Sequence, residues 1–239
     1  MRLFCAHRAK SPPGNGNCSK YSNIHKMPSK KTPPLPSESD DFARLRAQSP
    51  MSVFAEWYAD AENTGAPHPE AMTLATVSAN GRPQARTVLL KEFTDETFVF
   101  FTNRESRKGL ALAANPRAAL LFYWPLLARQ VKIEGDTAEI SRTHSARYFA
   151  SRPRQSRIGA WASAQSRPVE SPSAFAEKAR EIEKKFADEE PSLPPHWGGY
   201  RLTPLRMEFW REGEHRMHLR LAFERAAAAD EWQSGFLQP

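Results

Sequence analysis

The sequence predicts a mainly β fold, an antiparallel β-barrel with helical additions. Two observations carry this prediction. Six or more segments have strand character, and a tight turn at Asn80-Gly81 gives two of them a strong hairpin signal. Amphipathic helical patterns are inserted between the strands, as in barrels that carry additional helices.

The first predicted element is an amphipathic helix that begins near residue 50. Apolar residues from Met51 to Ala61 recur at helical spacing, and a sequence that ends at Gly65 is typical of the end of a helix. The hairpin follows, with strands at residues 72–77 and 84–91.

Three further strands and a short helix are predicted next. The strands cover residues 97–102, 118–123 and 130–140, and Ser106 is placed to cap a helix that runs to residue 115. From Gln130 to Glu134 polar and apolar residues alternate, so one face of that strand should be wet or lined by a ligand.

The chain beyond residue 142 begins with two predicted helices and ends with two predicted strands. The helices cover residues 143–151 and 172–188, and the second carries an apolar stripe from Phe175 to Phe186. The strands cover residues 200–210 and 216–224.

Composition separates a tail from a single domain. Residues 1–40 hold six prolines and a net charge of +5, without sustained periodicity, and are predicted to be a disordered basic tail. This tail could be an extension upstream of a second start at Met27, or a targeting peptide. Residues 41–239 are expected to form one domain that includes the final strands.

The charge distribution argues against a nucleic-acid partner, and no membrane partner is expected. The whole chain carries +7, but the part beyond residue 40 carries only +2, so the body is not strongly basic. Residues 118–128, the longest apolar stretch, contain Pro125 and are too short to span a bilayer. Cys5 and Cys18 imply no disulfide framework, which fits the reducing cytoplasm.

Cationic side chains at the ends of predicted elements are the main chemical signal. Convergent Arg and Lys donors are what a bound phosphate needs, and although each residue alone fits a solvated surface charge better, their joint placement favours a phosphate site. No metal-ligand cluster, phosphate loop or nucleophile elbow is found. The cations are Arg86 and Lys91, Arg107 and Lys108, and Arg152 and Arg154 on a Pro-containing turn beside Ser156.

Strand alternation at the C-terminus predicts a second polar cluster. If residues 216–224 form one strand, Arg216, His218 and Arg220 share one face, opposite Met217 and Leu219. A solvated strand face is the alternative interpretation. Trp161 and Trp210 could likewise be packed residues or walls for a planar cofactor.

Ten short blocks in the chain carry a family resemblance. They are residues 86–91 (Arg-Thr-Val-Leu-Leu-Lys), 101–103, 106–108, 129–131, 148–156 (Tyr-Phe-Ala-Ser-Arg-Pro-Arg-Gln-Ser), 158–161, 165–166, 197–200 (Trp-Gly-Gly-Tyr), 208–210 and 215–220 (His-Arg-Met-His-Leu-Arg). With these blocks in family order from about residue 50 to the C-terminus, the chain resembles the pyridoxamine 5′-phosphate oxidase family.

The resemblance implies an FMN-binding split barrel that works as a homodimer, with two flavins at the subunit interface. Arg86 and Lys108 would hold the phosphate region of FMN. The full set of implied cofactor contacts is Arg86, Thr87, Val88, Leu89, Leu90, Lys91, Phe101, Thr102, Arg107, Lys108, Gln130, Gln165, Ser166, Trp210 and Arg220.

The resemblance also implies the substrate contacts. The phosphate of a vitamin B6 substrate would be held by Lys91, Tyr148, Arg152 and Ser156. Arg216 and His218 would cover the pyridine ring beside the flavin and act as the catalytic pair.

The implied activity is oxidation of pyridoxamine 5′-phosphate and pyridoxine 5′-phosphate to pyridoxal 5′-phosphate, with O2 reduced to H2O2. The flavin supplies the electron chemistry, and the protein supplies orientation and charge. Two alternatives remain: a related split-barrel flavin oxidase acting on another planar substrate such as a phenazine precursor, and a non-catalytic protein that binds flavin or pyridoxal phosphate.

Three positions depart from the family pattern. Leu219 stands where the family commonly has Asp, and altered packing is expected there. Phe101 stands where Tyr is frequent. The Arg-x-x-Tyr motif of the family's N-terminal substrate lid is not recognisable before residue 50.

Overall fold

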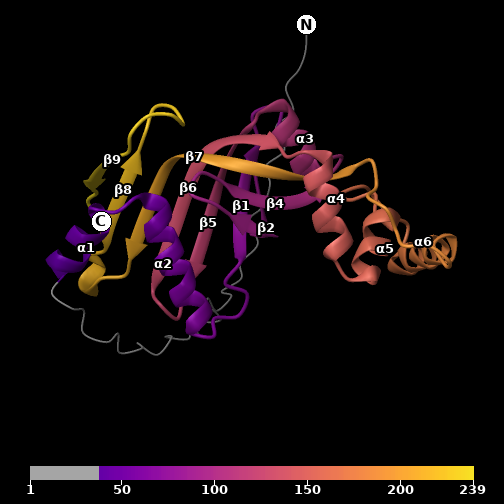
Figure 1. Cartoon of the computed structure of the whole chain (residues 1–239), viewed down its shortest axis with the longest axis horizontal. Helices are drawn as coiled ribbons and strands as arrows, with labels where there is room; N and C mark the ends of the chain where they lie inside the picture. The colour runs from indigo at the N-terminus through magenta and orange to yellow at the C-terminus, as the bar shows by residue number, and fades with distance from the viewer. Residues whose placement is uncertain (1–37) are drawn as a thin grey trace, which may run out of the picture. The chain divides into compact units, whose positions relative to one another are not determined.

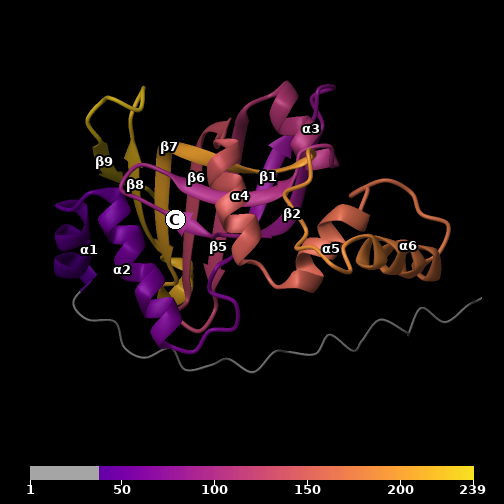
Figure 2. The ribbon, with the colours of Figure 1, turned by 45° about the vertical axis from the view of Figure 1, so that its right-hand side comes forward.

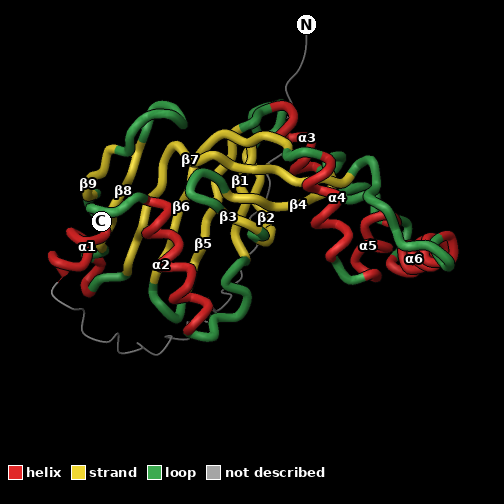
Figure 3. Tube along the Cα trace, in the orientation of Figure 1, coloured by secondary structure: helices red, strands yellow, loops and turns green. Residues whose placement is uncertain are grey.

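Residues 38–239 of the computed structural model are described, and they form one antiparallel sheet with helices on its faces (Figures 1 and 3). The strands are β1 (Ala71–Val77), β2 (Pro83–Leu89), β3 (Glu92–Phe93), β4 (Phe98–Asn103), β5 (Arg117–Trp124), β6 (Arg129–Glu139), β7 (Trp197–Arg211), β8 (Leu219–Glu224) and β9 (Gln233–Phe236). The helices are α1 (Glu38–Arg46), α2 (Pro50–Asn63), α3 (Arg107–Ala114), α4 (Arg142–Ser151), α5 (Arg154–Ala162), α6 (Pro172–Lys185) and the short 3-10 turn η1 (Glu214–Arg216).

The sheet is an antiparallel split barrel built around β7. Its order is β2-β1-β5-β6-β7-β4-β3, and the strand pairings within residues 38–239 are antiparallel. The first half of β7 pairs with β4 and the second half pairs with β8, which continues to β9. The mainly β, antiparallel fold predicted from the sequence is therefore confirmed.

A β-bulge in β7 changes which residues face the core. The register with β6 shifts between Glu134 and Gly135, which leaves Leu205 without a partner on β6. Before this point Leu202 is buried, whereas beyond it Met207 and Phe209 are buried. The extra residue thus changes which side chains of β7 point into the core, from even-numbered residues before the bulge to odd-numbered residues beyond it.

Helix α2 closes the core on one face of the sheet. Ser49 caps the helix by accepting a hydrogen bond from the Ser52 N–H, and Pro50 occupies its first turn. Phe54 is fully buried, and its ring meets Phe98 at 4.8 Å and Phe122 at 5.2 Å between centroids. The helix therefore joins strands that are distant in sequence.

Most predicted elements are confirmed, with four corrections. The segment predicted as a Pro-containing turn continues as α5, and the predicted strand at 216–224 begins only at Leu219. The strands β3 and β9 were missed because each is very short. The apolar stripe predicted on α6 is largely exposed. Phe175, at the start of the stripe, is exposed, whereas Phe186, at its end, is buried.

The tail boundary also shifts. Helix α1 begins at Glu38, and its Phe42 and Leu45 are buried, so ordered structure starts before residue 41. The prediction for residues 1–37 lies outside the described residues. No helix within residues 38–239 is long and apolar enough to cross a membrane.

The position of Phe54 predicts a large stability effect. Replacing Phe54 with Ala should lower the free energy of unfolding by about 3–5 kcal/mol, because a fully buried ring leaves a cavity. Urea unfolding followed by circular dichroism measures this. A loss below about 1 kcal/mol would contradict the central role of the α2 contact.

Candidate active site

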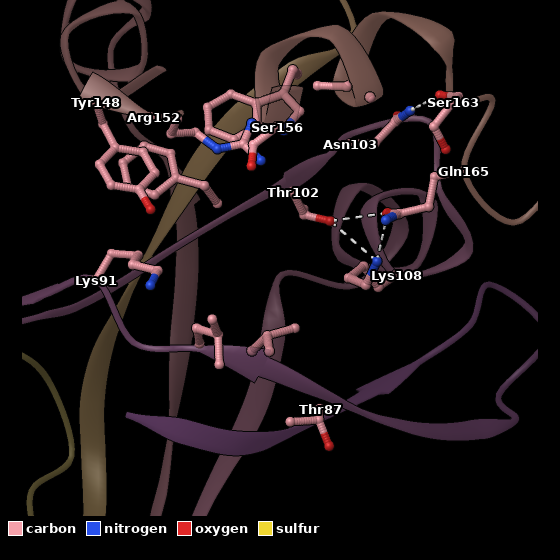
Figure 4. A pocket seen from close by; sticks show the side chains of 16 residues that line it. Thr87, Lys91, Thr102, Asn103, Lys108, Tyr148, Arg152, Ser156, Ser163 and Gln165 are labelled. Carbon is pink, nitrogen blue, oxygen red and sulfur yellow. Dashed lines mark hydrogen bonds between the residues drawn. The ribbon is translucent and has the colours of Figure 1, made fainter. Parts of the chain in front are cut away.

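A cavity of about 400 Å³ opens between the β2–β3 connection, β4, α4 and α5 (Figure 4). Its volume falls within the range of small-molecule sites. The side chains around it come from both halves of the sequence. They are Thr87, Val88, Leu89, Lys91, Phe101, Thr102, Asn103, Lys108, Tyr148, Arg152, Ser156, Ser163, Gln165 and Trp197, together with Gly159 and Ala160.

The four residues expected to hold a substrate phosphate all line this cavity. Tyr148 and Arg152 lie four residues apart at the end of α4, and Ser156 lies in the first turn of α5. Lys91 follows β2, where its N–H donates to the Val99 carbonyl oxygen at 2.9 Å. Figure 4 shows Tyr148, Arg152 and Ser156 together on one wall, with Lys91 near Tyr148.

Arg152 is a half-buried cation without a counter-ion among residues 38–239. Burial lowers the pKa of its guanidinium, and Nη1 is buried without a hydrogen-bond partner in the described part of the chain. Burial also raises the pKa of the Tyr148 phenol, which keeps that hydroxyl protonated and able to donate. The two groups offer donors suited to an anion.

A hydrogen-bonded triad forms the opposite wall. The Lys108 ammonium donates to Thr102 Oγ1 at 3.1 Å and to Gln165 Oε1 at 2.8 Å. Burial, with a smaller contribution from Arg86, lowers the pKa of Lys108 to about 8. Its hydrogen-bond acceptors are neutral, so the ammonium charge remains available to a ligand.

A second cavity of about 400 Å³ adjoins this wall and shares Lys108. Arg86, Arg107 and Ser166 line it together with residues 83–85. Burial and the nearby positive charge of Arg107 lower the pKa of Arg86. Ser166 has a φ of 72°, a left-handed conformation that strains a non-glycine residue and is common at functional sites.

The separation of Arg86 from Lys91 follows from the end of β2. Arg86 lies inside the strand and donates to the Leu74 carbonyl oxygen and to Thr76 Oγ1, whereas Lys91 lies beyond Leu89, the last strand residue. The two cations therefore line different cavities. Leu90 is buried in the core and lines neither of them.

The remaining predicted residues form a separate group, around the junction of β6, β7 and β8. Gln130, Trp210 and Arg220 are cross-strand neighbours in one row. The His218 ring lies 4.8 Å from Trp210. None of these residues, nor Arg216, lines either cavity of the same chain.

The alternation argument for this group is wrong. Arg216 belongs to η1 with a φ of 66°, and His218 precedes β8, so the two residues do not share a strand face with Arg220. Leu219 packs against the core, as expected for an apolar residue there. Trp161 contacts Phe186 and lines neither cavity.

Several cavity residues were absent from the predicted contacts, notably Asn103, Ser163 and Trp197. The Asn103 side chain donates to the Ser163 carbonyl oxygen at 3.3 Å and accepts from the Glu105 N–H at 2.8 Å. Trp197 opens the matched block 197–200, which was the available sequence signal.

An antiparallel split barrel with two adjoining cation-lined cavities defines the class of FMN-binding split-barrel flavoproteins. Residues 59–186 match the family model described as pyridoxamine 5′-phosphate oxidase. Residues 197–239 match the C-terminal dimerisation region of pyridoxine 5′-phosphate oxidase. The chain therefore belongs to the pyridoxamine 5′-phosphate oxidase family.

Individual relatives agree with this assignment. A pyridoxine/pyridoxamine 5′-phosphate oxidase of Cupriavidus necator is 53% identical over 193 residues, covering 81% of this chain and 90% of the relative. One from Bordetella pertussis is 53% identical over 178 residues, covering 74% and 84%. Among solved structures, PhzG from Burkholderia lata 383 in complex with tetrahydrophenazine-1-carboxylic acid matches with a TM-score of 0.78 and 29% identity, covering 88% of this chain and all of that one.

Family members use FMN, and the described residues fit this cofactor. Arg86, Arg107 and Lys108 present positive charge to one cavity, and within residues 38–239 none of the three is ion-paired with a carboxylate. A phosphate dianion is the complementary ligand for such a set. The adjoining cavity, lined by Thr102 and Gln165, leaves space for a planar ring system.

The lowered pKa of Lys108 predicts a pH dependence for FMN binding. The free apoprotein loses the Lys108 proton as pH rises through about 8, whereas a phosphate dianion favours the charged form. Above pH 8 binding must therefore take up a proton, and affinity should fall by up to about tenfold per pH unit. Quenching of FMN fluorescence on titration with apoprotein measures this.

The matched control is Lys108→Arg, because a guanidinium stays charged throughout this pH range. This variant should show a flatter dependence between pH 8 and pH 9.5. An equal slope in both proteins would mean that another group titrates.

Proposed function

We propose that the chain oxidises pyridoxamine 5′-phosphate and pyridoxine 5′-phosphate to pyridoxal 5′-phosphate, using FMN and O2 and releasing H2O2. The observation that carries the proposal is the gathering of Lys91, Tyr148, Arg152 and Ser156 around one cavity, next to a second cavity lined by cations. Two adjoining sites for phosphate suit a phosphorylated coenzyme and a phosphorylated substrate. The relatives at 53% identity carry the same activity in their names.

In this proposal the cavity lined by Tyr148 and Arg152 binds the substrate phosphate. Arg152 and Lys91 contribute positive charge, and the protonated Tyr148 hydroxyl and the Ser156 hydroxyl donate hydrogen bonds. Charge-assisted contacts of this kind hold the substrate in one orientation, and orientation of the reacting carbon is the protein's main contribution to the rate.

The adjoining cavity holds FMN through Arg86, Arg107 and Lys108. Bound FMN supplies the two-electron oxidation of the substrate and passes the electrons to O2. Thr102 and Gln165, which already accept hydrogen bonds from Lys108, fix that ammonium group between the two cavities. The Lys108 charge can thus serve either phosphate.

We further propose that Arg216 and His218 complete the site of the partner subunit in a homodimer. They lie within the matched dimerisation region, 197–239, yet line neither cavity of their own chain. Large side chains nearby are exposed: Met217 by 64%, and Tyr123, the cross-strand neighbour of Gln130, by 57%. Exposed apolar surface of this kind is what a second copy covers.

The similarity to PhzG keeps one alternative open for testing. That structure contains tetrahydrophenazine-1-carboxylic acid, which carries no phosphate in its name. Lys91, Tyr148, Arg152 and Ser156, which line one cavity and offer donors to a phosphate, favour a phosphorylated substrate here. Turnover of pyridoxamine 5′-phosphate and of the phenazine acid, measured side by side, separates the two activities.

We place the enzyme in the cytoplasm, where its two cysteines would remain reduced.

Removing the Arg152 charge tests the function. In FMN-loaded protein, Arg152→Met should lower kcat/KM for pyridoxamine 5′-phosphate about 10- to 100-fold, mainly through KM, because one charged hydrogen-bond donor is lost. Absorbance of pyridoxal 5′-phosphate and released H2O2 report turnover. Arg147→Met, on the exposed side of the same helix, is the control and should behave as wild type. Wild-type holoenzyme without turnover would exclude the proposed activity.

Mixed dimers test the shared site. Arg152→Met and Arg216→Met homodimers should each be impaired while retaining FMN absorbance. Mixing the two by co-expression places both altered residues in one of the two sites and leaves the other site intact. Activity should therefore recover to about half of wild type per heterodimer. Heterodimers that remain as inactive as the parents would show that each subunit uses its own Arg216.

A further inference from the structure

Trp197 lies at the start of β7, against the wall that carries Tyr148 and Arg152. Its side chain is only 6% exposed, and it faces Asn103 of β4 in the strand register. Its carbonyl oxygen accepts a hydrogen bond from Arg142 at the beginning of α4, the helix that carries Tyr148. The indole is therefore fixed between the sheet and this helix.

Three aromatic rings lie nearly parallel at this position. Phe101 stacks on Tyr148 at 4.0 Å and on Trp197 at 5.3 Å, with interplanar angles of 17° and 9°. The Trp197 and Tyr148 planes are tilted by 11°. The space for Phe101 depends on Gly199, since a Cβ there would lie 2.8 Å from two carbons of the Phe101 ring.

The Arg152 guanidinium lies over the indole, with its central carbon 4.9 Å from the centroid of the Trp197 ring. Stacking uses the face of a guanidinium, whereas an ion pair with a carboxylate would use its N–H donors. Nη1 of Arg152 has no partner within the described chain. The indole thus stabilises the cation through the face of the guanidinium. The N–H donors at the edge of the guanidinium remain available to an anion.

We propose that Trp197 is a positioning residue for the phosphate of the substrate, through its contacts with Arg152 and Tyr148. This inference rests on the proposed function, because it assigns a phosphate to these two groups. Without the indole, Arg152 would lose its stacking surface and sample other rotamers. Part of the binding free energy of the phosphate would then be spent on ordering that side chain.

Inorganic phosphate and turnover together test the inference in the FMN-loaded enzyme. Trp197→Leu should weaken phosphate, measured as the Ki against pyridoxamine 5′-phosphate and by calorimetry, about tenfold, and Trp197→Phe only about two- to threefold. KM for the substrate should rise in parallel with Ki. The kcat and the FMN content per subunit should stay within about twofold of wild type. A merely structural role would not produce this split.

The matched control is Trp124→Phe. Trp124 is as buried as Trp197, at 2% exposed, but lines neither cavity, so phosphate affinity should not change. An unchanged Ki in Trp197→Leu, or a loss of kcat at constant KM, would overturn the inference. If the leucine variant does not fold, an unchanged Ki in Trp197→Phe has the same meaning. Calorimetry reports phosphate binding without turnover, so a failure of the proposed activity remains distinguishable.

Discussion

Positive charge that is partly buried and has no carboxylate partner within residues 38–239 is the constraint on which this structure depends. Burial lowers the pKa of Arg86, Lys108 and Arg152, which means that the folded protein holds each cation at a cost. The fold brings them together from β2, α3 and the end of α4. Anionic ligands remove this cost, so ligand binding and stability of the folded state are coupled.

Local signals made much of the fold predictable. The Ser106 cap, the Asn80-Gly81 turn and the periodicity of α2 act over a few residues, and they gave the elements nearly correct bounds. The limits of β8 and the bulge near Leu205 depend on pairing with distant strands. Alternation along a single segment does not reveal them, which is why the shared face of Arg216, His218 and Arg220 was predicted wrongly.

The residues of the candidate site likewise divide into those that local sequence spacing relates to one another and those that only the fold brings together. Helical spacing alone could relate Tyr148 to Arg152, but only the resemblance joined them to Lys91, which is far away in the sequence. Trp197 was missed because its role depends on four side chains meeting in space. The surroundings of position 219 also depend on tertiary contacts: Leu219 packs against the core and pairs with Arg211 across the sheet, and Arg211 forms an ion pair with Asp41 of α1 at 3.3 Å.

The strand β7, 15 residues long, restricts where this chain can gain or lose residues during evolution. The strand carries Trp197 at one end and Trp210 at the other, and its single bulge fixes which side chains point inward at each end. Insertion or deletion of one residue would turn one end over and shift its neighbours on β4, β6 or β8. The exposed helix α6, which projects from the sheet in Figure 2 and has no buried residues, is free of that restriction. Natural variation in length should accumulate there, while β7 keeps its residue count.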